Sequence, residues 1–311
     1  MRFFVIGGTG FLGTFLLPKL IKSGYDVTVL TRSKEKATRL ESLGIKGVFG
    51  DLLQPELFIS RLAPQDVVIV IARPEIKPGR ISRKRFRKLQ EQATTYFSTS
   101  IALAEKFCCP LVITLGTGFS TTGEEIADEN WPIERIGIAR IGEFVDPLLS
   151  KVIDRGSPPL IQMLPGQIYG SGGLFRNLLY KWMTRGKYRV VGAGDNYIPR
   201  IHVEDCADAY VKMLEKMPLG ERFIIADDLP CTMREFVNFM ADCMKVPRPK
   251  SVPGLIIRAV LGKLMYETVT MNCLVSNSKA KKYLDWKLKY PTYRDGLPVT
   301  IQELENDKQE R

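Results

Sequence analysis

Short apolar runs without polar alternation recur along the first half of the chain. Runs of this kind are typical of strands that are buried on both faces of a parallel sheet. A helical spacing of apolar residues, from Phe15 to Ile21, separates the first two runs. Because strand and helix signals alternate, the pattern predicts an α/β fold with a doubly wound parallel sheet. The predicted strands span residues 3–6, 26–30, 47–52, 66–72 and 111–116.

A glycine motif lies between the first predicted strand and the first predicted helix. A loop in this setting binds the pyrophosphate of a dinucleotide. Its glycines allow a tight turn and a close approach of backbone N–H groups to the phosphates, and the helix turns its positive end toward their charge. We therefore predict a dinucleotide-binding Rossmann unit. The candidate cofactor residues of this loop are Gly7, Thr9, Gly10, Phe11, Leu12 and Gly13.

The end of the second predicted strand indicates which dinucleotide is bound. A carboxylate there would accept a hydrogen bond from the ribose 2′-hydroxyl of NAD. Residues 30–34 contain no carboxylate, and they include Arg32 and Ser33. Since a guanidinium can pair with a 2′-phosphate, we predict NADP(H), with Arg32 as the main phosphate ligand and Ser33 as a helper.

Composition limits the class of protein. The chain has 311 residues, of which 45% are hydrophobic and 25% charged. This globular composition excludes a disordered or collagen-like chain. The six cysteines form no C-x-x-C pair, which favours a reduced protein and predicts no metal site. No apolar run approaches the roughly 20 residues that span a bilayer, and we expect a cytoplasmic protein.

The net charge of +11 is concentrated in part between Arg73 and Lys88, where eight basic residues stand against one acid, Glu75. This segment follows the fourth predicted strand, at the sheet edge where ligands bind. It could close over an anionic substrate, contact an anionic lipid surface, or be a solvated loop. An acidic block at residues 124–129 either faces it or is hydrated. Phe86 is the lone aromatic residue of the segment, which argues against base stacking and nucleic acid.

Further motifs follow in chain order. They are Gly50-Asp51, Pro165-Gly166-Gln167-Ile168-Tyr169-Gly170, Ile201-His202-Val203-Glu204-Asp205, and residues 279–286 with 293–297. Together with the glycine loop, they make almost the whole chain resemble the extended short-chain dehydrogenase/reductase superfamily, which includes nucleotide-sugar epimerases and dehydratases. The resemblance implies that Asp51 lies near adenine and that Pro165 and Gly166 lie near nicotinamide. Leu52 and Ala72 complete the set of candidate cofactor residues.

The resemblance also implies two lobes. Residues 1–170, with a return segment at about 195–215, would form the NADP-binding Rossmann domain. Residues 171–194 and 216–311 would form a smaller α+β cap over the substrate. An apolar helical stretch at residues 253–265 favours a partly apolar substrate, a membrane-facing surface, a partner contact such as a homodimer, or a place in the core.

The catalytic Tyr-x-x-x-Lys pair of the superfamily is absent from this sequence. In that pair, the positive charges of lysine and nicotinamide lower the pKa of the phenol, which exchanges a proton with the substrate. Here no tyrosine lies between Tyr96 and Tyr169, and no lysine between Lys106 and Lys151. Thr117 stands where the family places a hydroxyl that hydrogen-bonds the substrate oxygen.

Residues 134–143 occupy the place of the missing pair. One alignment puts Arg140 at the lysine position, and an alignment on Glu143 shifts the register by one residue. Arg140 can bind ribose hydroxyls, but it cannot donate a proton near neutral pH. The candidate catalytic residues are therefore Thr117, Tyr169, Arg140 and Glu143. His202, the only histidine, is a further candidate that fits a buried structural role better.

Three functions are compatible with these features. We favour an NADP(H)-dependent oxidoreductase that reduces a small, partly apolar, anionic biosynthetic intermediate with another proton donor. The second is an NADP(H)-binding regulatory, assembly or scaffold protein without catalysis. The third is an epimerase, dehydratase or isomerase that retains its cofactor and acts on a nucleotide-linked or anionic metabolite.

Overall fold

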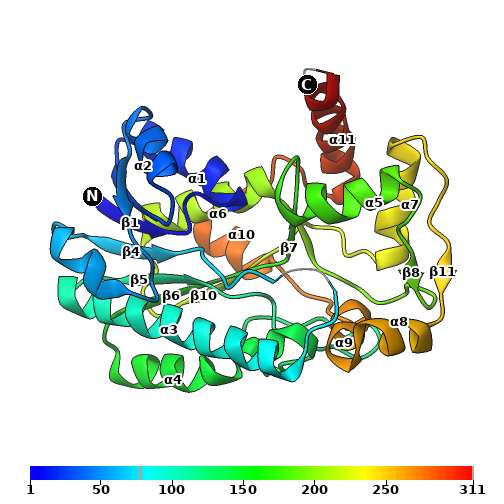
Figure 1. Cartoon of the computed structure of the whole chain (residues 1–311), viewed down its shortest axis with the longest axis horizontal. Coiled ribbons are helices and arrows are strands. Elements are labelled where there is room, and N and C mark those ends of the chain that lie inside the picture. The colour runs from blue at the N-terminus through cyan, green and yellow to red at the C-terminus, as the bar shows by residue number, and fades with distance from the viewer. Residues whose placement is uncertain (77–78, 310–311) are drawn as a thin grey trace.

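A seven-stranded parallel sheet forms the centre of the computed structural model, which describes residues 1–76 and 79–309 (Figure 1). The strand order is β10-β6-β5-β4-β1-β2-β3. Strand β1 pairs with β2 on one side and with β4 on the other, so the chain order reverses there. Ligands bind at such a reversal, outside the carboxyl ends of the strands. The strands are β1 (Arg2–Ile6), β2 (Asp26–Thr31), β3 (Lys46–Phe49), β4 (Val67–Val70), β5 (Leu111–Thr114), β6 (Leu160–Pro165) and β10 (Arg222–Ile225).

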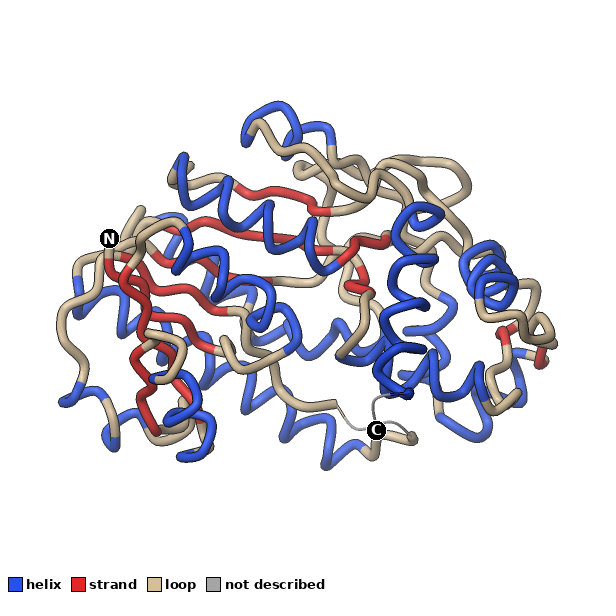
Figure 2. Tube along the Cα trace, turned by 90° about the horizontal axis from the view of Figure 1, so that it is seen from above, coloured by secondary structure: helices blue, strands red, loops and turns tan. Residues whose placement is uncertain are grey.

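Helices cover both faces of the sheet, which confirms the predicted doubly wound α/β fold (Figure 2). On one face, α1 (Phe11–Lys22), α2 (Lys34–Glu41), α6 (Val203–Lys216) and α10 (Ser278–Leu284) enclose one core. On the opposite face, α3 (Arg83–Phe107) and α4 (Asp146–Arg155) enclose a second hydrophobic core. Successive strand side chains alternate between the two cores, as the apolar runs predict. Three short 3-10 helices, η1 (Pro55–Leu57), η2 (Ile59–Arg61) and η3 (Gly137–Phe144), lie in the connections.

The second lobe, the cap, has a core of its own. Tyr169, Phe236 and Tyr293 lie at its centre. Helix α7 begins with a capping box in which the Thr232 and Glu235 side chains bond each other's backbone N–H groups. The elements of this part are β7 (Gln167–Tyr169), η4 (Phe175–Tyr180), α5 (Lys181–Thr184), β8 (Val190–Val191), β9 (Arg200–His202), α7 (Met233–Cys243), β11 (Ser251–Val252), α8 (Gly254–Leu261), α9 (Lys263–Thr270) and α11 (Tyr293–Gln309).

Part of the segment that the sequence assigned to the cap, residues 216–311, lies in the Rossmann lobe instead. Strand β10 pairs with β6 and forms one edge of the central sheet. Helix α10 packs on α6 and β10, and its Ala280 and Leu284 are fully buried in the adjoining core. The reason is that Phe223 to Ile225 is an apolar run, which is stable only when both of its faces are covered.

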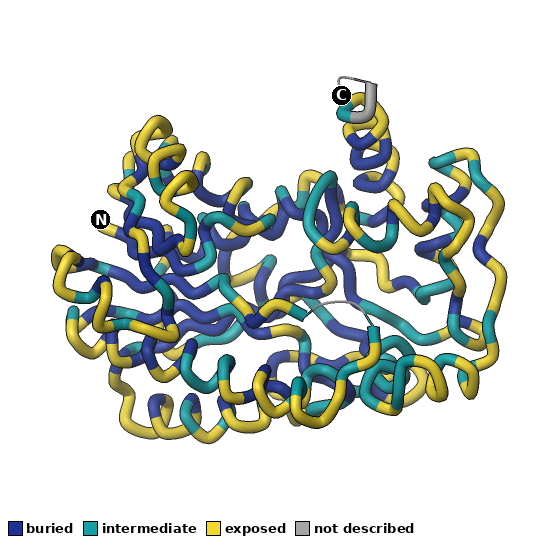
Figure 3. Tube along the Cα trace, in the orientation of Figure 1, coloured by how far each residue is buried: buried dark blue, intermediate teal, exposed yellow. Residues whose placement is uncertain are grey.

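The apolar stretch at residues 253–265 is neither one helix nor core. Gly262, with φ of +85°, separates α8 from α9. Leu255, Ile256 and Val260 on α8 are exposed, Leu255 by 78%. In Figure 3 the trace of α8 has the colours of exposed and intermediate residues. Among the described residues, no helix is long and apolar enough to cross a membrane.

Candidate nucleotide and reaction site

The glycine loop lies directly on the end of β4. A Cβ atom at Gly7, where φ is +93°, would lie 2.5 Å from the backbone nitrogen of Ala72. A Cβ atom at Gly13 would lie 2.0 Å from the carbonyl oxygen of Gly8. Both positions therefore require glycine, because any side chain would push the loop away from the sheet.

The first turn of α1 is left open for a ligand. Gly10 is its N-cap and supplies no side chain to bond the free N–H groups of Phe11 and Leu12. A Cβ atom at Gly10 would contact only the carbonyl oxygen of Gly7, at 3.1 Å, and would project beside these donors. Uncapped N–H groups at the positive end of a twelve-residue helix fit a pyrophosphate. Thr9 lies on this loop and is partly exposed.

The end of β2 presents an unpaired cation. Arg32 is exposed and forms no hydrogen bond or ion pair with another described residue. The Ser33 hydroxyl accepts a hydrogen bond from the Lys36 backbone N–H at 3.2 Å and caps α2. Arg32 is therefore available to a ligand, whereas the Ser33 oxygen already has a structural partner.

The loop after β3 carries the next two candidate cofactor residues, Asp51 and Leu52. Asp51 accepts a hydrogen bond from the Leu53 backbone N–H at 3.0 Å, and Leu52 is buried in the core. The Thr99 hydroxyl on α3 donates to the carbonyl oxygen of Leu52 at 3.2 Å. This bond fixes the long helix α3 against the loop, and α3 also brings Tyr96 to this place, a residue that sequence reasoning did not select.

Thr117 lies on the loop that leaves β5, at the carboxyl edge of the sheet. It is half-buried, and its neighbour Gly116 is exposed, with open space where a Cβ atom would be. The Thr117 side chain lies beside the thiol of Cys273. Burial raises the pKa of Cys273 to about 11, so the thiol stays neutral.

The segment around Cys273 comes from the far end of the chain. The Asn272 side chain accepts a hydrogen bond from the Tyr197 backbone N–H at 2.7 Å and donates to the Thr121 carbonyl oxygen at 3.1 Å. These bonds tie the segment to the loop after β5. No local pattern predicts this contact, because its two partners are separated by about 150 positions.

Arg140 and Glu143 lie on η3 and bind each other. Their side chains form an ion pair at 2.8 Å, and both are more than a third exposed. The Gln90 side chain donates to the Arg140 carbonyl oxygen at 3.1 Å and also contacts Glu143. Helix α9 packs on η3. The hydroxyl of Thr268 on α9 accepts a hydrogen bond from the Ile138 backbone N–H on η3 at 2.8 Å.

Tyr169 does not lie at the reaction site, which corrects its assignment as a catalytic candidate. It is 1% exposed, and its ring packs against Phe175, His202 and Phe236 in the cap core. Its hydroxyl has no hydrogen-bond partner, and burial raises its pKa far above the usual value. A phenol enclosed in this way cannot reach a substrate.

His202 caps a helix in the interior of the protein. Its ring accepts a hydrogen bond from the Glu204 backbone N–H and caps α6, and its other nitrogen contacts the Thr300 hydroxyl at 3.2 Å. Burial lowers the pKa of His202 to about 4.

Pro165 and Gly166 end β6 and are buried beside β10. The Gly166 backbone N–H donates to the Ile225 carbonyl oxygen at 2.9 Å. A Cβ atom at Gly166 would lie 2.7 Å from the carbonyl oxygen of Pro199, so this turn also requires glycine. The two residues thus stand at the carboxyl edge of the sheet, and their position near nicotinamide stays a prediction.

The two charged segments have different surroundings. In the acidic block, Glu129 is buried and accepts a hydrogen bond from the Ile224 backbone N–H at 2.9 Å. In the basic segment, Lys77 lies outside the described residues, and the stretch from Arg83 onward is the start of α3. Arg73 lies three residues beyond the end of β4 and is exposed.

Residues 7–105 match the model of the NAD(P)H-binding family. Over this stretch the chain is similar to NAD(P)H-binding domains, and the whole chain has the fold of the extended short-chain dehydrogenases/reductases. A human epimerase family protein, solved with NADPH, aligns with a TM-score of 0.78 at 19% identity and covers 98% of this chain and 100% of its own.

Two similar proteins are named as reductases. The chain is 24% identical to 3-diazoavenalumate denitrifying reductase from Streptomyces sp, over 96% of this chain and 99% of the relative. It is also 24% identical to 4-hydroxy-2-methyl-3-oxo-4-farnesyl-3,4-dihydroquinoline-1-oxide ketoreductase from Stigmatella aurantiaca, over 78% of this chain and 73% of the relative.

Proposed function

We propose that the protein is an NADP(H)-dependent reductase that acts on a small, partly apolar, anionic intermediate without a tyrosine as proton donor. Arg32 carries the cofactor assignment, because it is an exposed guanidinium without a partner among the described residues, at the place where NAD-binding chains have a carboxylate. The names of the two similar reductases support reduction as the reaction class.

Different residues of the chain bind the cofactor and the substrate in this reaction. The glycine loop and the open turn of α1 hold the pyrophosphate, and Arg32 pairs with the 2′-phosphate. When bound, the cofactor supplies a hydride to an electrophilic carbon of a C=O, C=N or conjugated C=C group. Thr117 donates a hydrogen bond to the atom that gains negative charge.

Water supplies the proton in this proposal. The Tyr169 hydroxyl is buried, Arg140 is too basic, and Glu143 is held by Arg140 and Gln90. The open space beside Gly116 lets water reach an atom that is bound at Thr117. Hydride and proton together would complete the two-electron reduction.

The cofactor part is tested by fluorescence titration with NADPH and NADH. Arg32→Ala removes the phosphate partner, so the Kd for NADPH rises about 10- to 100-fold while the Kd for NADH stays within about twofold. Arg39→Ala, which removes an exposed arginine from α2, is the matched control and leaves both affinities unchanged. A wild-type protein that binds both cofactors equally would refute the assignment.

The reductase part is tested by NADPH consumption with a panel of carbonyl, imine and conjugated alkene substrates that carry a carboxylate. Turnover by the wild type and its loss in Thr117→Val, with unchanged NADPH affinity, supports the proposal. Tight NADPH binding without consumption across the panel favours the scaffold function instead.

A further inference from the structure

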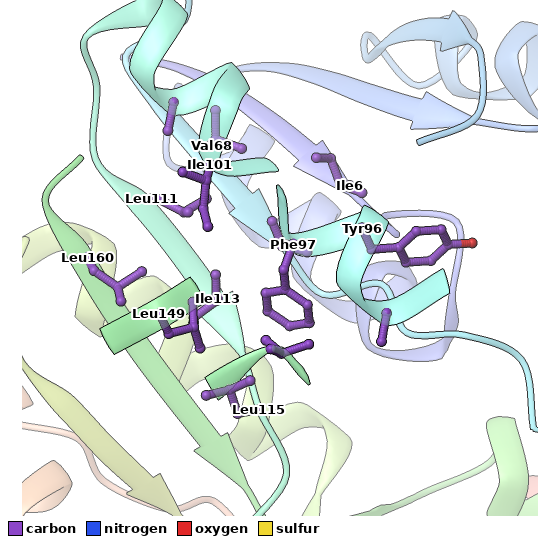
Figure 4. Packing of buried hydrophobic residues seen from close by; sticks show 14 of the residues in the cluster. Ile6, Val68, Tyr96, Phe97, Ile101, Leu111, Ile113, Leu115, Leu149 and Leu160 are labelled. Atoms are coloured by element: carbon purple, nitrogen blue, oxygen red, sulfur yellow. The ribbon is translucent and has the colours of Figure 1, made fainter. Parts of the chain in front are cut away.

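Tyr96 has a buried ring and an accessible hydroxyl. The residue is 8% exposed, and its ring lies in the core that also holds Ile6, Leu30 and Leu52. Figure 4 shows the hydroxyl pointing away from the other labelled core side chains. The ring is therefore held in place by packing, and only the oxygen projects from the core.

The core neighbours of Tyr96 place this oxygen at the adenosine end of the nucleotide site. Leu30 stands two residues before Arg32 on β2, and Leu52 directly follows Asp51. The hydrogen bond from Thr99 to the Leu52 carbonyl oxygen, one helical turn beyond Tyr96, fixes α3 against the same loop.

The phenol of Tyr96 is influenced by two charges of opposite sign, those of Arg32 and Asp51. Burial raises the pKa of Tyr96, the Asp51 carboxylate raises it further, and the Arg32 guanidinium lowers it. The phenol thus lies in the field of both residues that the sequence assigned to the adenosine moiety.

The hydroxyl has no protein partner among the described residues. It forms no hydrogen bond with Arg32 or Asp51, and Asp51 already accepts one from Leu53. It is also not one of the fully enclosed atoms that lack a partner, in contrast to the hydroxyl of Tyr169. A buried ring that carries a reachable, unpaired hydroxyl into a nucleotide site has the geometry of a ligand-binding group.

We propose that the Tyr96 hydroxyl is a hydrogen-bond ligand for the adenosine end of the bound dinucleotide, between Arg32 and Asp51. This inference rests on the proposed function, because that function places adenosine at these two residues. The packed ring cannot stack on the base, so the contact is a single hydrogen bond to an acceptor atom of either the 2′-phosphate or the adenine. Tyr96 is then a binding residue for the cofactor and takes no part in proton transfer.

Tyr96→Phe tests the proposal, because it removes the oxygen and keeps the ring. Calorimetric titrations use NADPH, adenosine 2′,5′-bisphosphate and adenosine 5′-monophosphate. We expect about fivefold weaker NADPH binding, from the loss of one hydrogen bond. Selective weakening of the bisphosphate identifies the phosphate as the acceptor, and equal weakening of both fragments identifies the base or ribose. Unchanged affinity for all three compounds would overturn the inference.

Two controls separate the possible failures. Tyr283→Phe alters a half-exposed tyrosine that packs on Phe223 at the opposite edge of the sheet, and it leaves all three affinities unchanged. An unfolding temperature within about 2 °C of the wild type shows that Tyr96→Phe keeps the core. If the wild type binds the two fragments with equal affinity, the NADP assignment is refuted. If the wild type prefers the bisphosphate but Tyr96→Phe has the same affinities as the wild type, only the role of Tyr96 is refuted.

Discussion

The cofactor side and the reaction side of the site differ in how many of their polar groups are already paired. On the cofactor side, the first turn of α1 is uncapped, and Arg32 and the Tyr96 hydroxyl have no partner among the described residues. On the reaction side, the Arg140 and Glu143 side chains pair with each other, and the Gln90 side chain donates to the Arg140 carbonyl oxygen.

This difference shows how the two sides obtain their chemistry. The cofactor side uses backbone N–H groups and a helix end, which exist wherever the local fold is formed. The reaction side depends on side chains from distant segments, so its groups pair with one another until a substrate offers a better partner. A substitution that disturbs the backbone of the glycine loop should therefore have the largest effect on NADPH binding. A substitution of a side chain that lies outside the site should have the smallest effect on turnover.

The largest effect is expected for Gly13→Ala. The new methyl group would lie 2.0 Å from the Gly8 carbonyl oxygen, so the loop must move away from the position that binds the pyrophosphate. We expect the Kd for NADPH, measured by fluorescence titration, to rise at least about 100-fold.

Gly186→Ala is the control for this change. Its φ is +64°, and open space surrounds the position, so it costs about 1 kcal/mol of stability and leaves NADPH binding unchanged. Wild-type affinity in Gly13→Ala would remove the argument that backbone geometry governs the cofactor side.

An intermediate effect is expected for the pH dependence of stability. Because burial lowers the pKa of His202 from 6.5 to about 4, the unfolded chain binds a proton that the folded chain excludes between these pH values. The free energy of unfolding should therefore fall by about 3 kcal/mol from this residue as the pH drops from 7 to 4.

His202→Asn isolates this contribution, because asparagine still caps a helix but does not titrate. Urea unfolding at a series of pH values should show a shallower decline below pH 6.5 in the variant than in the wild type. Parallel curves for the two proteins would contradict the structural role of His202 and bring it back as a candidate for the reaction side.

The smallest effect is expected for Tyr169→Phe. The change removes a buried hydroxyl that has no partner, so stability should stay within about 1 kcal/mol of the wild type or rise. Turnover with any substrate found in the NADPH screen should remain within about twofold. A loss of turnover with unchanged stability would show that the phenol reaches the substrate after all, and would break the contrast between the two sides.

The sequence by itself determined five strands of the central sheet, β1 to β5, and the nucleotide loop. Apolar runs such as Val67 to Val70 need cover on both faces, and the Gly7 to Gly13 motif encodes a turn and a helix end within a few residues. Arg32 could be selected for the same reason, since its position follows from the end of β2.

Only the tertiary structure decided which side chains meet at the reaction site. It brought Cys273 to Thr117 and Tyr96 to the adenosine end, it placed β10 in the central sheet, and it enclosed Tyr169 in the cap core. These outcomes depend on packing between segments that are far apart in the chain, and a local pattern carries no signal for such contacts. Local signals determine backbone geometry, whereas burial and pairing of single side chains are properties of the whole fold.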